Sequence, residues 1–155
     1  MITNWHTANI DPSHLSRRLR IAYVLWLWEA VKNDDGFPNL ASLQAAELYE
    51  ALAPYATLSE GQRDADIRTF IYISSGAKVN ELYNGSLAAK RFDEVLSKSG
   101  QNLAEEAYAT MRKETKPVHI GVTGSPVLDK DMEAITLPLL HDNRAMELSL
   151  MVYDF

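Results

Sequence analysis

The spacing of apolar residues divides the chain into a helical first part and a strand-rich last part. Apolar positions follow a helical stripe after Pro12, and from Ile21 to Val31 nearly every position is apolar. Asp11 is suited to cap this segment and Pro12 to its first turn, where a missing N–H costs nothing. The pattern predicts a helix from Pro12 to Asn33 that is buried on more than one side.

Two interpretations of this helix remain open. It is either buried entirely within its own chain, or one side lies on the domain and the other meets the same helix of a second subunit. We expect the second arrangement. The predicted homodimer interface consists of Leu19, Tyr23, Trp26 and Leu27.

After this helix, the helical pattern is interrupted at four residues that end or break helices: Gly36, Pro38, Pro54 and Gly61. Residues 1–61 are therefore expected to form an N-terminal helical module, followed without a flexible linker by a core over 62–155, so that the chain is effectively one domain. Within the core we expect a strand over 66–74, an ambiguous strand or helical turn over 77–85, a short helix within 86–100 and an amphipathic helix over 101–115.

Three strands are predicted to close the chain. In the first, Val118, Ile120 and Val122 alternate with His119, which faces the other side of the sheet. The last two should form a hairpin around a four-residue loop, HDNR. That loop places Leu139 opposite Met146, Leu137 opposite Leu148 and Ile135 opposite Leu150, all on one apolar face. The other face is mixed, and we expect the Trp-rich helix to cover it.

Composition excludes several classes of protein. The chain has 155 residues, a net charge of -6 and no cysteine. An acidic chain is a poor nucleic-acid binder, because that binding needs clustered Lys and Arg, and the basic cluster Arg17, Arg18 and Arg20 fits a solvated helix face. The apolar run ending at Val31 is far shorter than the roughly 20 residues of a membrane-spanning helix. We therefore expect a cytoplasmic protein without membrane insertion.

Candidate chemistry is sparse. The histidines lack metal-ligand spacing, so no metal site is predicted. His119 is the best candidate for contacting a buried ligand, although a structural histidine is the more ordinary interpretation. His141 and Asp142 form a neighbouring pair, but both fall in the hairpin loop and should face solvent. No catalytic motif is present, so we expect no enzymatic activity.

A ligand pocket, if one exists, should lie between the amphipathic helix and the hairpin. Core packing is the ordinary role of the residues expected there, and methionine side chains would make such a pocket adaptable to an apolar ligand. The candidate ligand-binding residues are Tyr108, Met111, His119, Leu137, Leu139, Met146 and Leu148.

Three segments carry a resemblance to a known family. They are LWEAVKNDDGFPNLASL at 27–43, FIYISSGAKVNELYNGSL at 70–87 and ITLPLLHDNR at 135–144. With the order of elements, they resemble the PAS domain, specifically the bacterial single-domain PAS family with an N-terminal helical extension. The resemblance implies an α+β fold with a five-stranded antiparallel sheet, flanking helices and a small cavity between them. It also implies that the N-terminal helix packs on the outer sheet face and dimerises.

The function implied is that of a PAS-like sensory or protein-interaction module, which forms a homodimer and passes its output to a separate signalling protein. The resemblance implies that the module binds a small ligand or a partner; haem or flavin is compatible with it, but neither is required. Because the sequence ends at Phe155 without a further helix, the N-terminal helix is the expected route to a partner. The alternative is a small cone-shaped α+β enzyme or carrier of an apolar molecule, which would need an ionisable residue pointing into its pocket.

Overall fold

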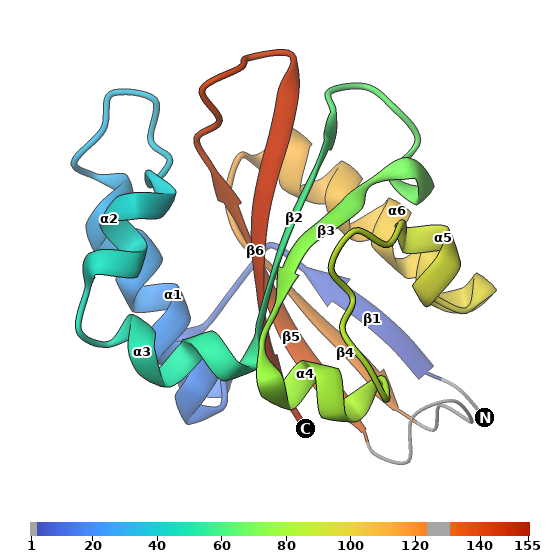
Figure 1. Cartoon of the computed structure of the whole chain (residues 1–155). Coiled ribbons are helices and arrows are strands. Elements are labelled where there is room, and N and C mark those ends of the chain that lie inside the picture. The colour runs from blue at the N-terminus through green and yellow to red at the C-terminus, as the bar shows by residue number, and fades with distance from the viewer. Residues whose placement is uncertain (1–2, 124–130) are drawn as a thin grey trace.

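The computed structural model describes residues 3–123 and 131–155, which form an α+β fold around one antiparallel sheet (Figure 1). The order of the six strands across the sheet is β1-β4-β5-β6-β2-β3. Their bounds are β1 Thr3–Thr7, β2 Ala56–Gln62, β3 Ile71–Ser75, β4 Val118–Thr123, β5 Met132–Leu139 and β6 Met146–Asp154.

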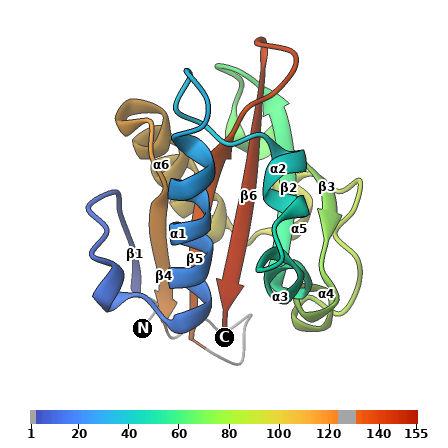
Figure 2. The ribbon, with the colours of Figure 1, turned by 90° about the vertical axis from the view of Figure 1, so that its left-hand side faces the viewer.

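Helices cover both faces of this sheet. One face carries α1 (Arg17–Ala30), α2 (Leu40–Ala45) and α3 (Tyr49–Leu52), which lie on the near side in Figure 2. The other carries α4 (Ala77–Leu82), α5 (Phe92–Val95) and α6 (Lys98–Glu114). Short 3-10 turns are η1 (Pro12–His14), η2 (Ala53–Tyr55) and η3 (Ile67–Thr69). No helix in the described ranges has the length and apolar character needed to span a bilayer.

The long helix predicted from Pro12 is split in the structure. Asp11 caps the 3-10 turn η1 by accepting a hydrogen bond from the Ser13 N–H, as its sequence position suggested. The chain then becomes extended, and Ser16 caps the separate helix α1 by accepting from the Leu19 N–H. The segment thus contains two N-capping residues, Asp11 and Ser16, and each starts its own helical element.

The register of the β5–β6 hairpin differs from the prediction by two residues. Leu139 stands opposite Leu148 rather than Met146, Leu137 opposite Leu150, and Ile135 opposite Val152. The turn is longer than the four residues assumed, which slides one strand along the other. Because side chains alternate with a period of two, a shift of two keeps every residue on its predicted face.

The helices that cover the two faces are the reverse of those expected. The apolar face with Leu137 packs under α1, and the mixed face packs under α6. Polar groups explain this choice. On the mixed face, the Ser149 hydroxyl meets the Tyr108 hydroxyl of α6 at 2.7 Å, and Glu147 accepts from Arg112 Nε at 2.8 Å. Both partners of these groups, Tyr108 and Arg112, belong to α6.

The first 61 residues contribute two strands as well as helices, which corrects the expectation of a purely helical module. β2 crosses the proposed boundary at residue 61 and pairs with both β3 and β6. β1 pairs with β4 and makes the sheet six-stranded rather than five-stranded. The Trp5 ring of β1 lies on Gly121, where an added Cβ would come within 2.1 Å of a ring atom, so any larger residue there would displace the ring.

Smaller differences concern the middle of the core. The strand expected over 66–74 begins with the 3-10 turn η3 and is a strand only from Ile71. The ambiguous segment 77–85 contains the helix α4. The helix expected within 86–100 is a single turn, α5, and α6 already begins at Lys98. The amphipathic helix and β4 lie close to where the sequence placed them.

Candidate functional site

A cavity of about 90 Å³ lies between the sheet and the helices α5 and α6. Its walls come from all six strands, from the end of α4, and from the α5–α6 region between Phe92 and Tyr108. Apart from the carboxamide of Asn4, the side chains that line it are apolar, aromatic or hydroxyl-bearing, and among the described residues they include no Asp, Glu, Lys, Arg or His. A site of this composition suits an uncharged molecule with few polar groups.

Four tyrosines converge on the cavity from separate elements: Tyr72 from β3, Tyr83 after α4, Tyr108 from α6 and Tyr153 from β6. Burial raises the pKa of Tyr83 to about 12, and it raises the pKa values of Tyr72 and Tyr153 well above the ordinary value. Burial also raises the pKa of Tyr108, against the opposing hydrogen bond with Ser149. All four hydroxyls therefore stay neutral near pH 7, able to hydrogen-bond but unsuited to act as bases.

Two further polar groups in the cavity wall lack well-formed hydrogen bonds. Within residues 3–123 and 131–155, the buried atoms Thr57 Oγ1 and Asn4 Oδ1 have no hydrogen-bond partner. The Thr57 hydroxyl lies close enough to the Tyr153 hydroxyl to oppose part of the rise in the pKa of Tyr153. Buried polar groups are usually satisfied, so unpartnered ones in a cavity wall indicate room for a water or a ligand group.

Aromatic rings make one side of the cavity rigid. The ring centroids of Tyr72 and Phe92 lie 4.7 Å apart, and Phe92 and Tyr108 meet edge-to-face at 6.0 Å. Phe70 contacts both Phe92 and Tyr108 at 5.9 Å. Interlocked rings of this kind have few alternative rotamers, so this wall is preformed.

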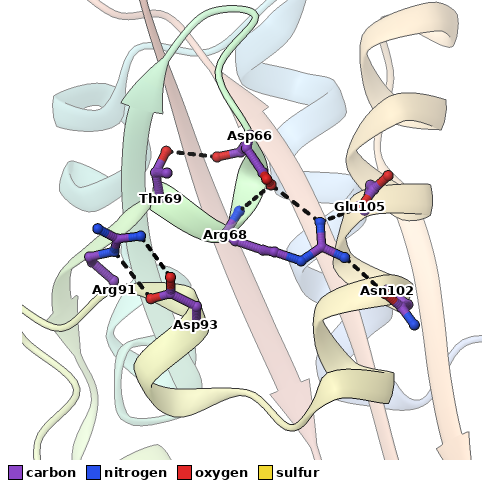
Figure 3. A network of polar contacts seen from close by, with 7 residues as sticks. All are labelled: Asp66, Arg68, Thr69, Arg91, Asp93, Asn102 and Glu105. Atoms are coloured by element: carbon purple, nitrogen blue, oxygen red, sulfur yellow. Dashed lines mark hydrogen bonds and ion pairs between the residues drawn. The ribbon is translucent and has the colours of Figure 1, made fainter.

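A polar network on the protein surface joins η3 to α6 (Figure 3). Arg68, in η3, donates through Nη1 to Asp66 at 3.2 Å and to Glu105 on α6, and through Nη2 to Asn102 at 2.8 Å. Arg91 and Asp93 form a second, two-bond pair at the start of α5. The first network ties α6 to the turn that precedes β3.

The residues predicted to bind a ligand do not form one site. Tyr108 lines the cavity described above, whereas Met111, Leu139 and Leu148 line a second cavity of about 120 Å³ near the hairpin turn. Leu137 is buried under α1 on the opposite face of the sheet. They were expected to lie together because the faces of the sheet had been assigned to the wrong helices.

Met146 and His119 are also separate from the cavity. Met146 is half-buried at the start of β6, where it pairs with Gln62 of β2. His119 points to the other face of β4, away from Val118 and Ile120. Whether any residue of the predicted set contacts a ligand stays a prediction.

Sequence reasoning missed most of the cavity wall, including Tyr72, Tyr83, Tyr153 and Thr57. A signal did exist, because the strand segments FIYISS and LMVYDF each place a tyrosine, Tyr72 or Tyr153, among apolar residues. Alternation alone could not tell which of these side chains would meet α6.

The predicted dimer interface is divided in a similar way. Leu19 and Trp26 are buried in their own chain, and Tyr23 is half-buried. Of the four, Leu27 alone is exposed. Two large apolar residues near it are exposed as well: Trp28 on α1 and Val31 at the end of that helix. For Leu19 and Trp26 the prediction of a dimer contact is therefore corrected, because both side chains pack on the sheet of their own chain and are not available to a second subunit.

His119 is held in a tight environment on the α1 side of the sheet. The Trp5 ring meets it edge-to-face at 4.7 Å, and its Nε2 lies 3.7 Å from a Glu133 carboxylate oxygen. Nε2 has no hydrogen-bond partner among the described residues. Burial lowers the pKa of His119 below 6.5, and the Glu133 carboxylate opposes this shift.

We expect this histidine to make stability depend on pH. The unfolded chain takes up a proton at His119 near pH 6.5, whereas the folded chain does so only at lower pH. The free energy of unfolding should therefore fall as pH drops below about 6.5. Urea unfolding between pH 5 and 7.5 should show a shallower slope in His119→Gln than in the native chain. The matched control, His14→Gln, changes an exposed histidine and should keep the native slope.

His141 is hydrogen-bonded to a different carboxylate from the one its sequence position suggested. Its Nε2 lies 3.0 Å from Glu60 on β2, and its Nδ1 accepts a hydrogen bond from the Asn143 N–H at 2.9 Å. Both ring nitrogens are thus engaged. The histidine holds the hairpin turn against β2, and neither nitrogen is left to act as a base.

Comparison with known proteins gave no relatives: the chain matches no family model, no curated protein and no solved structure. Within residues 3–123 and 131–155, no group of three or more His, Asp or Glu side chains is placed to hold a metal ion. The cavity and its lining therefore carry the functional argument.

Proposed function

We propose that the protein is a PAS-like sensory module that binds a small uncharged ligand in the cavity between the sheet and α5–α6. The observation that carries this proposal is the cavity's lining of neutral tyrosine hydroxyls and aromatic rings. The order of elements supports the resemblance: β3 is followed by α4, α5 and α6, then by β4 and the β5–β6 hairpin. Ligand occupancy would be reported to a separate signalling protein.

The alternative function, an enzyme or carrier with an acid or base in its pocket, has less support. Such a protein needs a His, Asp or Glu side chain directed at its ligand. The described residues that line the cavity supply none, and the tyrosine hydroxyls remain protonated near pH 7. This lining therefore fits a protein that binds its ligand without converting it better than it fits an enzyme.

The homodimer is part of the same proposal, but on a corrected surface. On its outer side α1 presents Leu27 and Trp28, and Val31 follows at its end. Exposed Arg17 lies at the start of this helix and exposed Asp34 and Asp35 lie beyond its end. If two copies of α1 packed antiparallel about a two-fold axis, the basic end of each would meet the acidic end of the other.

Native mass spectrometry of protein purified from cells tests both parts of the proposal. We expect a dimer mass together with a retained small molecule. Ala104→Leu places a larger side chain in the cavity wall and should reduce the ligand-bound fraction about tenfold, since even a few added methylenes overfill a small site. Ala109→Leu is the matched control on the exposed side of α6 and should leave the ligand in place.

Two results would contradict the proposal. A ligand-free species that acquires no small molecule from a cell extract would remove the sensory function. A species that stays monomeric at high protein concentration would remove the dimer alone and leave ligand binding intact.

A further inference from the structure

A second cavity, of about 120 Å³, lies at the opposite end of α6 from the α5–α6 turn. Four segments far apart in the sequence build it: the loop after α1, the end of β2, the last turn of α6 and the β5–β6 hairpin. Phe37, Met111, Pro138, Leu139 and Leu148 provide its apolar lining. Nothing in the proposed sensory function uses this cavity.

Two guanidinium groups distinguish this cavity from the first. Arg112 donates through Nε to both carboxylate oxygens of Glu147, at 2.8 and 3.0 Å. Its Nη2 is buried and has no hydrogen-bond partner in the described parts of the chain. Arg63, on the rim, donates through Nε to the Arg144 carbonyl oxygen at 3.0 Å, which fixes its position against the hairpin.

The charges around this cavity do not balance. Arg63 and Arg112 carry two positive charges, and among the described residues that line the cavity Glu147 is the single carboxylate. A buried cationic N–H group without a partner is unusual, because guanidinium groups keep most of their hydrogen bonds when they leave water. An anion in the cavity would neutralise the excess positive charge, and an anion within reach of Nη2 would give that group a hydrogen-bond partner.

From these observations we propose that the second cavity binds a small organic carboxylate with a short apolar tail. A carboxylate matches the planar geometry of a guanidinium group, and Arg63 and Arg112 both line the cavity. The tail would contact Met111, Leu139 and Leu148. This site is independent of the neutral cavity, so the protein would respond to two kinds of small molecule through opposite ends of α6.

Methionine-methyl NMR of the full chain tests the proposal, with sodium hexanoate as the probe and 1-hexanol as its uncharged counterpart, at constant ionic strength. Met111 reports on the second cavity, whereas Met132 and Met151 line the first. We expect hexanoate to shift the Met111 signal in a saturable way and to leave those of Met132 and Met151 unchanged. Hexanol should bind at least about fivefold more weakly, because it lacks the charge-assisted hydrogen bonds.

Substitutions at two exposed basic residues sharpen the test. Arg63→Gln should weaken hexanoate binding about fivefold. Lys78→Gln, at an exposed site on α4 that lines neither cavity, should leave it unchanged. Circular dichroism confirms that both variants fold. The proposal is overturned if hexanol binds as tightly as hexanoate, if Arg63→Gln keeps native affinity, or if the shifts occur at Met132 and Met151 instead of Met111.

Discussion

Replacing Trp26 with alanine is expected to lower the free energy of unfolding by about 4 kcal/mol, the cost typical of deleting a buried aromatic side chain. Trp26 is 5% exposed and belongs to the apolar cluster between α1 and the sheet. Its indole Nε1 also donates to the Pro138 carbonyl oxygen at 2.8 Å. The substitution would leave a cavity and an unsatisfied carbonyl together. Urea unfolding followed by circular dichroism measures the change.

Trp28 provides a matched control for this experiment. It lies two residues further along the same helix but is 60% exposed. In dilute, monomeric protein its replacement by alanine should cost less than about 0.5 kcal/mol. A larger cost that grows with protein concentration would come from the proposed dimer, because subunit association stabilises the folded chain by mass action. Equal costs for the two substitutions in dilute protein would contradict the burial of Trp26 described above.

The second large effect is expected at Gly76, where β3 ends and α4 begins. An alanine Cβ here would lie 2.2 Å from the Ala53 carbonyl oxygen and 2.4 Å from that of Pro54. Both contacts are with backbone atoms, which cannot move aside as a flexible side chain can. We expect Gly76→Ala to cost about 3 kcal/mol, because the β3–α4 junction must separate from η2.

The same substitution at Gly100 should have the opposite sign. Gly100 lies in the first turn of α6, and an added Cβ would meet its nearest neighbours, in Leu96 and Ser97, at 3.4 Å, an ordinary contact distance. Alanine also restricts the unfolded chain more than glycine does, so we expect a gain of about 0.5 kcal/mol. Thermal unfolding of both variants gives the comparison. If Gly76→Ala were as stable as the native chain, the close approach of η2 to this position would be wrong.

Much of the secondary structure could be predicted where a segment is long and its pattern regular. The amphipathic pattern around Tyr108 predicted α6, and the alternation around Ile120 predicted β4. β1 was missed because TNWHT is short, lies at the sheet edge and has no alternating pattern. The split before α1 was missed because Ser16 is a capping residue inside an otherwise helical stretch.

The candidate site was much harder to predict than the elements that build it. Tyr108 was identified because it lies on the apolar side of a regular helix. Its companions Tyr72 and Tyr153 lie on strands, where alternation tells only which neighbours share a face. Identifying them requires knowledge of which helix covers that face, and this depends on the pairing of the Tyr108 hydroxyl with Ser149 across the core.

The sequence by itself determined the type of most elements and the two faces of the closing hairpin, because side-chain periodicity is a local property of the backbone. It also determined that the candidate chemistry would be sparse, since no cysteine and no catalytic motif is present. Only the tertiary structure decided that α6 covers the mixed face and α1 the apolar one. That choice depends on burying polar groups together with partners from distant segments. It placed the tyrosine-lined cavity between the sheet and α5–α6 and the arginine-lined cavity near the hairpin turn. It also left Leu27, Trp28 and Val31 exposed on α1 and at its end.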